Sequence, residues 1–192
     1  MRPLFTIHAG EFVVGEFIEK TFPSLQIWIP SKDTGIDLLV TNARNSSLVS
    51  LQVKLSRDYK TLEASNNYER NLVAAGWLTL SHEKIAKSTA DWWVFVLVSH
   101  ERKMKPQFIV IPPNELLRRL VAIHGASDRY HFYPRVTKSK VALEERGLSS
   151  SEKNAFADGD FILGERDLSQ FLSNWSALES LTLNSPLSLK TI

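Results

Sequence analysis

The side chains best suited to chemistry alternate along one short segment, residues 48–55 (LVSLQVKL). Successive side chains of a strand point to opposite faces, so Gln52 and Lys54 share one polar face opposite an apolar one. A lysine is rarely buried without a partner, and the partner expected here is Asp37, which lies in the preceding apolar run. We therefore expect Asp37, Gln52 and Lys54 to meet across two neighbouring strands.

Helix periodicity places a second acidic residue near this group. At about 100° per residue, Glu11 falls between Ile18 and Phe22 on the apolar stripe of the helix expected over residues 8–22. An acidic side chain on a stripe that faces the core is costly unless a partner or a function compensates for its lost hydration. Glu11 is therefore expected to point toward the sheet that carries Asp37.

These residue types suit a metal-assisted hydrolytic site. Mg²⁺ prefers hard oxygen ligands, and the expected set is Glu11, Asp37, Gln52 and the backbone carbonyl of Val53, with Mn²⁺ as a substitute. The metal would lower the pKa of a bound water and neutralise charge on a phosphoryl group. Lys54 would orient or deprotonate that water, or stabilise the transition state as a fixed cation. The competing interpretation is that Asp37 is an ordinary turn residue and that Gln52 and Lys54 lie on a strand face exposed to solvent.

The elements that must position these residues follow from periodicity and from turn signals. We expect helices over 8–22, 63–75, 115–123 and 167–183, strands over 25–29, 36–41, 48–55, 91–99 and 108–111, an edge strand at 130–133, and a loop over 147–160. This order predicts a mixed α/β (α+β) domain, with one central mixed sheet flanked by helices.

The length of 192 residues predicts a single domain over residues 1–183. Within it, the motif-bearing core covers about 8–124 and a C-terminal appendage covers about 125–183. Residues 184–192 are expected to form a flexible tail.

The composition excludes several classes of protein. The chain has no cysteine, so disulfides, thiolate zinc sites and a cysteine nucleophile are excluded. No apolar run reaches the roughly 20 residues needed to span a bilayer, and the N-terminus lacks the apolar core of a signal peptide. The sequence also lacks a P-loop, a G-x-S-x-G turn and zinc-protease histidine spacing. We therefore expect a cytoplasmic protein without a membrane partner.

The net charge of +2 conceals an uneven distribution. Residues 100–153 carry 11 basic and 6 acidic side chains, whereas residues 154–192 carry 2 and 5. Basic side chains gathered on one face would attract phosphates, and Arg118 and Arg119 are candidates for such a surface. The alternative is a solvated surface with scattered basic residues.

The order of the candidate residues resembles the PD-(D/E)xK nuclease superfamily, which has the restriction-endonuclease-like fold. The matching segments are HAGEFVVGEF around Glu11, GIDLLV around Asp37, and LQVK, which ends at Lys54. The Q-x-K form looks like the branch of methylation-directed restriction enzymes, in which glutamine also replaces the second acid. Two departures are the amide of Gln52 in place of Asp or Glu, and the missing proline before Asp37.

This resemblance implies a Mg²⁺-dependent endonuclease that hydrolyses DNA phosphodiester bonds, with RNA as an open alternative and a homodimer as an assembly seen in the family. Glu11, Asp37, Gln52 and Lys54 would be the catalytic residues. The segment after the lysine strand would contact the nucleic-acid backbone through Ser56, Arg57, Tyr59 and Lys60. The alternative function is a nuclease-fold module without catalysis that binds nucleic acid or a protein.

Three tryptophans are candidates for stacking on a base, Trp77, Trp92 and Trp93. The apolar strand expected around Trp92 and Trp93 favours burial of these two residues in the core.

Overall fold

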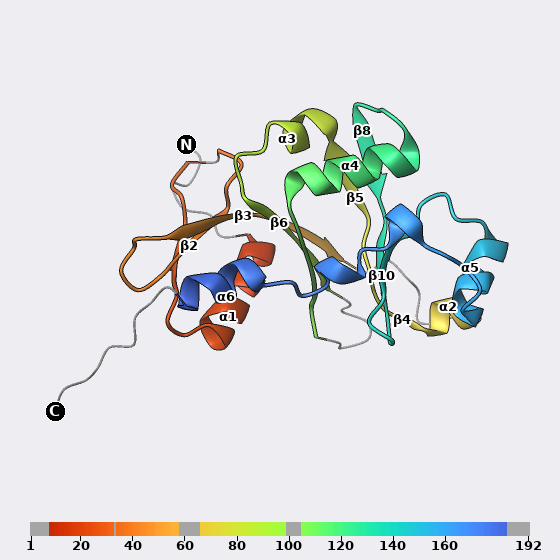
Figure 1. Ribbon diagram of the computed structural model, residues 1–192, viewed down its shortest axis with the longest axis horizontal. Coiled ribbons are helices and arrows are strands. Elements are labelled where there is room, and N and C mark those ends of the chain that lie inside the picture. The colour runs from red at the N-terminus through yellow and green to blue at the C-terminus, as the bar shows by residue number, and fades with distance from the viewer. Residues whose placement is uncertain (1–7, 33, 58–65, 99–104, 184–192) are drawn as a thin grey trace.

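The computed structural model describes residues 8–32, 34–57, 66–98 and 105–183 (Figure 1). The tail expected at 184–192 lies outside the described residues. The candidate residues of the expected hairpin and of the first helix lie within them, as does most of the basic stretch.

A five-stranded mixed sheet forms the centre of the fold, in the order β1-β2-β3-β6-β7. Its strands are β1 (Gln26–Trp28), β2 (Leu38–Thr41), β3 (Leu48–Arg57), β6 (Trp92–Val98) and β7 (Gln107–Ile111). β1, β2 and β3 form an antiparallel meander, β3 pairs with β6 in parallel, and β6 pairs with β7 antiparallel. The predicted class, a mixed α/β fold with one central sheet between helices, is confirmed.

Two helices cover one face of this sheet. They are α1 (Ala9–Thr21) and α6 (Ser176–Leu183), which lie side by side in Figure 1. Val14 and Ile18 of α1 are buried against the inward-facing valines of β3 and β6. Phe17 stacks on Trp175, just before α6, with the ring centroids 5.0 Å apart. The chain thus returns near its C-terminal end to complete the layer that α1 begins.

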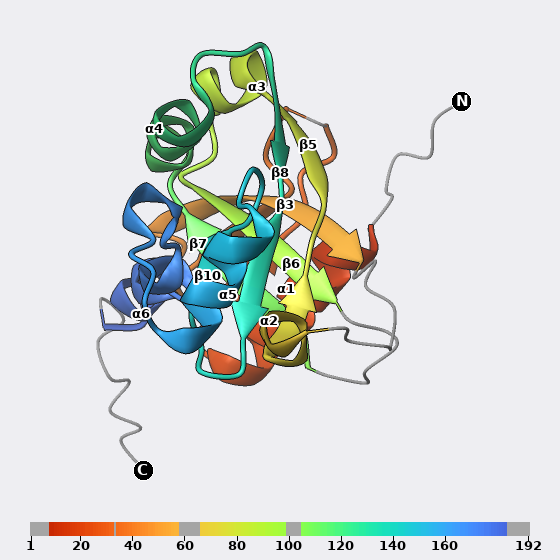
Figure 2. The ribbon, with the colours of Figure 1, turned by 90° about the vertical axis from the view of Figure 1, so that its right-hand side faces the viewer.

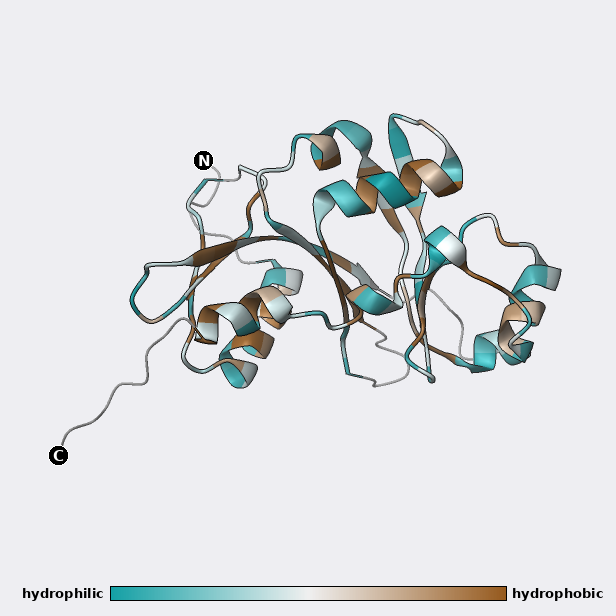
Figure 3. Cartoon of the chain, in the orientation of Figure 1, coloured by the Kyte–Doolittle hydropathy of each residue, from teal (hydrophilic) through white to brown (hydrophobic). Residues whose placement is uncertain are grey.

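The other face is covered by α3 (His82–Ala86), α4 (Pro113–His124) and two small sheets (Figures 1 and 2). β5 (Leu78–Ser81) pairs with β8 (Arg129–Phe132), and β9 (Pro134–Thr137) lies between β4 (Leu72–Ala75) and β10 (Ala142–Glu144). The remaining elements are α2 (Asn67–Arg70), α5 (Ser150–Asp158) and the 3₁₀ turns Gly164–Arg166 and Ser169–Phe171. Apolar residues of β6 and β7 face this second core, and hydrophilic residues mark the outer side of α4 (Figure 3).

Three predicted elements are wrong in part. The helix expected over 63–75 is, in its described part, the short α2 followed by β4, because residues 72–75 gain a strand partner in β9. The loop expected over 147–160 contains α5, and its serine and glycine mark the ends of a helix: Ser149 is the N-cap and Gly159 the C-cap. The helix expected over 167–183 is divided into a 3₁₀ turn and α6.

The long strand expected over 91–99 is confirmed as β6, whose five central residues are fully covered. Its burial on both faces explains its almost unbroken apolar sequence. Among the helices of the described ranges, none combines the length and apolar character that crossing a membrane requires.

Candidate functional site

The site begins where the hairpin of β2 and β3 opens. Cα pairing between the strands runs from Thr41 opposite Leu48 to Leu38 opposite Leu51, and β3 then continues to residue 57 while still paired with β6. The backbone N–H of Asp37 donates to the carbonyl of Leu51 at 2.8 Å. Two residues earlier the chain turns toward β3 at Gly35, whose φ of +85° favours glycine. Asp37 is therefore fixed beside the extended part of β3.

Beyond Leu51, β3 no longer pairs with the backbone of β2, and the side-chain carboxylate of Asp37 accepts hydrogen bonds there instead. Its Oδ2 accepts a hydrogen bond from the backbone N–H of Val53 at 2.6 Å and a second, short one from the side-chain amide of Gln52. Because the N–H and C=O of one strand residue point to the same edge, the Val53 carbonyl also faces this side. The structure thus brings Asp37, Gln52 and Val53 together as predicted.

Lys54 lies on the same face of β3 as Gln52. Its ammonium nitrogen is 5.5 Å from the centroid of the Trp93 ring on β6, within the range of a cation–π contact. Trp93 is itself fixed, because its indole N–H donates to the hydroxyl of Ser88 at 2.9 Å. The expected partner of Lys54 was Asp37, but none of the described ion pairs joins these two residues.

Glu11 is buried, as the helical wheel predicts, and lies in the first turn of α1. One of its carboxylate oxygens accepts the backbone N–H of His8, the N-cap residue, at 3.0 Å. The helix lies close to β3 here, since a Cβ added at Gly10 would be 2.9 Å from the Cβ of Leu55. Glu11 therefore caps its own helix while it lines the same pocket as Asp37.

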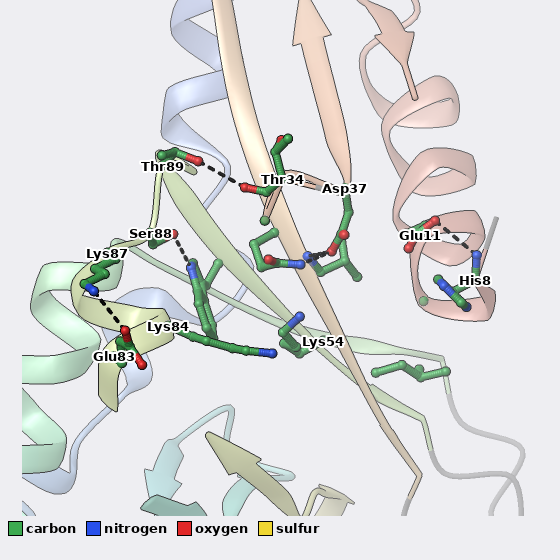
Figure 4. A pocket seen from close by; sticks show the side chains of 16 residues that line it. His8, Glu11, Thr34, Asp37, Lys54, Glu83, Lys84, Lys87, Ser88 and Thr89 are labelled. Atoms are coloured by element: carbon green, nitrogen blue, oxygen red, sulfur yellow. Dashed lines mark hydrogen bonds and ion pairs between the residues drawn. The ribbon is translucent and has the colours of Figure 1, made fainter. Parts of the chain in front are cut away.

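A pocket of about 490 Å³ joins these residues. Glu11 and Asp37 lie on the wall formed by α1 and the start of β2, whereas Lys54 lies on β3 and Lys84 on α3. Figure 4 shows Lys84 extending from α3 toward the side of the pocket that holds Lys54. The pocket thus has an acidic wall and a cationic wall, an arrangement that can hold a metal and a phosphate side by side.

Sequence analysis missed Lys84 because it missed α3. The available signal was Ser81, whose hydroxyl caps the helix by accepting the N–H of Lys84 at 3.3 Å. Lys87, one turn later, pairs with Glu83 at 2.8 Å on the pocket rim. Within the described part of the chain, Lys84 forms no such ion pair.

The oxygen donors fit Mg²⁺ better than they fit a transition metal. Across residues 8–32, 34–57, 66–98 and 105–183, no three His, Asp or Glu side chains gather as a metal-binding group. Two carboxylates and a backbone carbonyl are hard ligands, and Mg²⁺ is often held by one or two carboxylates with water and substrate phosphates. Gln52 was expected as a ligand, but its amide nitrogen donates to Asp37, so ligation through oxygen would require the amide to turn over.

Two of the residues expected to contact nucleic acid, Ser56 and Arg57, lie at the far end of β3. Ser56 is buried, and its hydroxyl accepts the backbone N–H of Trp77 at 2.9 Å and donates to the carbonyl of Trp77 at 3.2 Å. Arg57 is the last residue of β3, and Tyr59 and Lys60 lie outside the described residues. Contact of these residues with a nucleic-acid backbone stays a prediction.

Two arginines of the basic stretch form ion pairs with carboxylates of the fold. Arg118 pairs with Glu115 and Glu165 at 2.8 Å, and Arg119 pairs with Glu115 at 2.7 Å. The hydrogen bonds from Arg118, reinforced by those from Arg119, lower the pKa of Glu115 to about 2 despite its partial burial. These arginines join α4 to the segment around Glu165, and their contact with a phosphate stays a prediction.

A second charged group is buried around Glu145, and its residues do not line the pocket. Its carboxylate accepts the hydroxyl of Tyr68 at 3.0 Å, the ammonium of Lys153 at 2.6 Å, and a short hydrogen bond from Arg135. Burial, reinforced by the charge of Glu145, raises the pKa of Tyr68 well above its usual range. We call these four residues the Glu145 network.

Comparison of the chain with protein-family models, with curated proteins and with solved structures gives no significant match. The function proposed below therefore depends on the geometry of the residues themselves.

Proposed function

We propose that this protein is a Mg²⁺-dependent endonuclease that hydrolyses DNA phosphodiester bonds. The observation that carries the proposal is the placement of Asp37, Gln52 and Lys54 at the open edge of β3, facing a pocket that Glu11 also lines. The acid on the first helix, the aspartate at the start of β2 and the Q-x-K segment on β3 keep the order of the PD-(D/E)xK superfamily. A restriction-endonuclease-like fold is part of the same proposal.

Three oxygen donors would hold the metal: the carboxylates of Asp37 and Glu11 and the carbonyl of Val53. A bound Mg²⁺ would supply a water of lowered pKa and a counter-charge for the phosphate. Gln52 acts as a positioning residue, because its amide and the Val53 N–H both bond Oδ2 and thereby fix the Asp37 carboxylate. The second oxygen, Oδ1, takes no part in the hydrogen bonds of the described residues.

The cationic wall would receive the scissile phosphate. The Trp93 ring holds the Lys54 ammonium beside the pocket, which suits a fixed cation that stabilises developing negative charge and orients the attacking water. Lys84 reaches the same pocket from α3 and would neutralise a neighbouring phosphate oxygen. The two walls thus separate the metal-binding carboxylates from the phosphate-binding ammonium groups.

Asp37→Asn tests the proposal sharply because it changes charge with little change of shape. One oxygen of Asp37 accepts both hydrogen bonds, so the asparagine oxygen can accept the same two, whereas the negative charge is lost and the other oxygen becomes an NH2 group that cannot bind a cation. Plasmid or oligonucleotide cleavage should occur in wild type with Mg²⁺ or Mn²⁺ and be lost in Asp37→Asn. Equal cleavage by the two proteins would refute the metal-binding role of this carboxylate.

A second function, nucleic-acid binding without hydrolysis, is favoured by two contacts. Glu11 is used to cap α1, and Gln52 presents a hydrogen-bond donor, not an oxygen, to Asp37. This function predicts DNA binding that is unchanged by Mg²⁺, without cleavage, and that weakens steeply with salt. Cleavage by purified wild type that tracks the Asp37→Asn and Lys54→Ala changes would exclude it.

Two further parts of the proposal follow from the substrate. Cutting both strands of a duplex in one binding event requires two sites, so we infer a homodimer on DNA, which sedimentation with and without DNA would detect. A cysteine-free chain that acts on DNA suits the reducing cytoplasm. RNA is the alternative substrate, and cleavage of matched DNA and RNA oligonucleotides decides between them.

A further inference from the structure

The structure separates the three candidate tryptophans. Trp93 is buried and its indole N–H is bonded to Ser88, while Trp92 is half-buried against the core beneath α1. Trp77 has 55 % of its surface exposed. Tryptophan is mostly covered in folded proteins, so an exposed indole on a fixed backbone points to a binding role.

The backbone that carries Trp77 is fixed from several directions. Ser56 bonds both the N–H and the carbonyl of Trp77. The neighbouring Gly76 donates to the carbonyl of Pro134 at 2.8 Å and accepts from the guanidinium of Arg135 at 2.6 Å. A Cβ at Gly76 would lie 2.7 Å from a methyl carbon of Leu97, so the connection between β4 and β5 lies directly on the sheet. An exposed ring held this way loses little freedom when it binds a ligand.

An aromatic neighbour supports the ring. Tyr133 lies 6.1 Å from Trp77 between ring centroids, at an interplanar angle of 83°, and the Arg135 guanidinium is 5.9 Å from the Tyr133 ring. The edge-to-face contact braces the indole from one side. The charge of Arg135 is already paired with Glu145, so the described part of this patch offers an aromatic surface.

The position of Trp77 connects it to the pocket. Ser56, which holds it, lies two residues beyond Lys54 on the same face of β3, a separation of about 7 Å along a strand. A polymer whose phosphate lies against Lys54 and that continues along β3 toward Ser56 would reach Trp77 with its next unit. Among polymers with phosphate backbones, nucleic acids carry flat aromatic groups at that spacing.

We propose that Trp77 stacks on an unpaired base of the nucleic-acid strand whose phosphodiester lies in the pocket. The inference rests on the proposed function for its substrate and adds the substrate class: single strands, frayed ends or flipped bases. A base inside a duplex is already stacked on its neighbours and must leave them before it can meet a side chain. Stacking on an aromatic ring requires no particular base, so little sequence preference is expected here.

The experiment measures binding without cleavage. Fluorescence anisotropy of a labelled oligothymidine in EDTA at low salt should show Trp77→Ala binding about 5- to 150-fold more weakly than wild type. Trp77→Phe should retain most of the affinity, because it keeps an aromatic face. Trp28→Ala is the control, since Trp28 is 50 % exposed on the edge strand β1, where its indole N–H donates to the hydroxyl of Thr41 at 3.1 Å, and its removal should leave binding unchanged. The loss should be smaller for a blunt duplex of the same length.

The outcomes separate the two proposals. If wild type binds the oligonucleotide and Trp77→Ala binds it equally well, or if Trp28→Ala weakens it as much, the stacking role is overturned and the proposed function stands. If wild type binds no nucleic acid, both are overturned and a protein partner becomes the better occupant of this surface. Far-ultraviolet circular dichroism of the Trp77 variants should match wild type, because the two hydrogen bonds with Ser56 that fix position 77 come from its backbone.

Discussion

The pocket beside β3 and the Glu145 network use the same residue types in opposite ways. In the network, two cations and a tyrosine hydroxyl donate to one carboxylate, so each of these charges is paired within the fold. In the pocket, the carboxylates of Glu11 and Asp37 lie on one wall and the ammonium groups of Lys54 and Lys84 on another. Charges of opposite sign that line separate walls of one cavity suggest a ligand with both a cationic and an anionic part.

This difference distinguishes charges that stabilise the fold from charges that would bind a ligand. A buried ion pair contributes little net stability but is costly to break, because one charge is then left without a partner. A charge that faces a pocket can be removed at little cost to the fold, whereas its loss removes the interaction with a ligand. The four predictions that follow test this distinction.

The largest effect on stability is expected from Glu145→Ala. It leaves Arg135 and Lys153 without their carboxylate and Tyr68 without its acceptor, which should lower the free energy of unfolding by about 3–5 kcal/mol. Urea denaturation measures this loss. Glu83→Ala removes an exposed pair with Lys87 and serves as the control, with little expected change. A loss for Glu145→Ala as small as that of the control would remove the contrast between the two regions.

The largest effect on activity is expected from Lys54→Ala. Removing a fixed cation from the phosphate site should lower the cleavage rate by about 10²–10³-fold. The unfolding midpoint should stay close to that of wild type. Lys20→Ala, which removes an exposed lysine of α1, should cleave normally. A Lys54→Ala protein that is strongly destabilised, with activity unchanged below its midpoint, would class Lys54 with the structural charges.

Gln52→Glu places two carboxylates side by side in the pocket and tests whether a metal ion can bind between them. At neutral pH the amide donor to Asp37 is replaced by a second negative charge, so stability should fall by about 1–2 kcal/mol. Mg²⁺ should restore the lost stability by binding the folded form. Thermal unfolding with EDTA and with Mg²⁺ at pH 7 tests this; a deficit that Mg²⁺ leaves unchanged argues against a metal site.

The smallest effect concerns Glu115 and its arginines. The folded pKa of about 2 lies below the ordinary value of 4.5, so the stabilisation is present above about pH 4.5 and is lost as the pH falls toward 2. The pair is partly open to solvent, which reduces the expected contribution to about 1 kcal/mol. Denaturant unfolding between pH 2 and pH 6 should show this slope in wild type and less of it in Glu115→Gln. Cleavage at neutral pH should be nearly unchanged in the variant.

Local pattern predicted the parts of the site that neighbouring segments build. The alternation in residues 48–55 placed Gln52 and Lys54 on one face, and the short hairpin brought Asp37 beside Gln52. The helical wheel predicted the burial of Glu11. It could not predict the bond from Glu11 to the His8 backbone, because that contact depends on which turn of the helix is the first.

Contacts between distant segments could not be predicted in this way. Lys84 reaches the pocket from a helix of five residues, too short for periodicity to reveal. Tyr68 and Glu145 meet across 77 residues, and the basic stretch that suggested a phosphate surface supplies cations to carboxylates of its own half of the fold. The strand at 72–75 was mistaken for helix because its partner, β9, comes some 60 residues later.

The contact between Phe17 and Trp175 has a consequence for synthesis of the protein. Translation delivers α1 and the strands bearing Asp37 and Lys54 long before α6, which shares with α1 the task of covering their sheet. Until Trp175 and α6 have left the ribosome, the nascent chain exposes apolar residues of that sheet, the kind of surface that chaperones recognise. A stop codon placed before Trp175 should therefore yield an aggregation-prone chain, although every residue of the pocket has already been made.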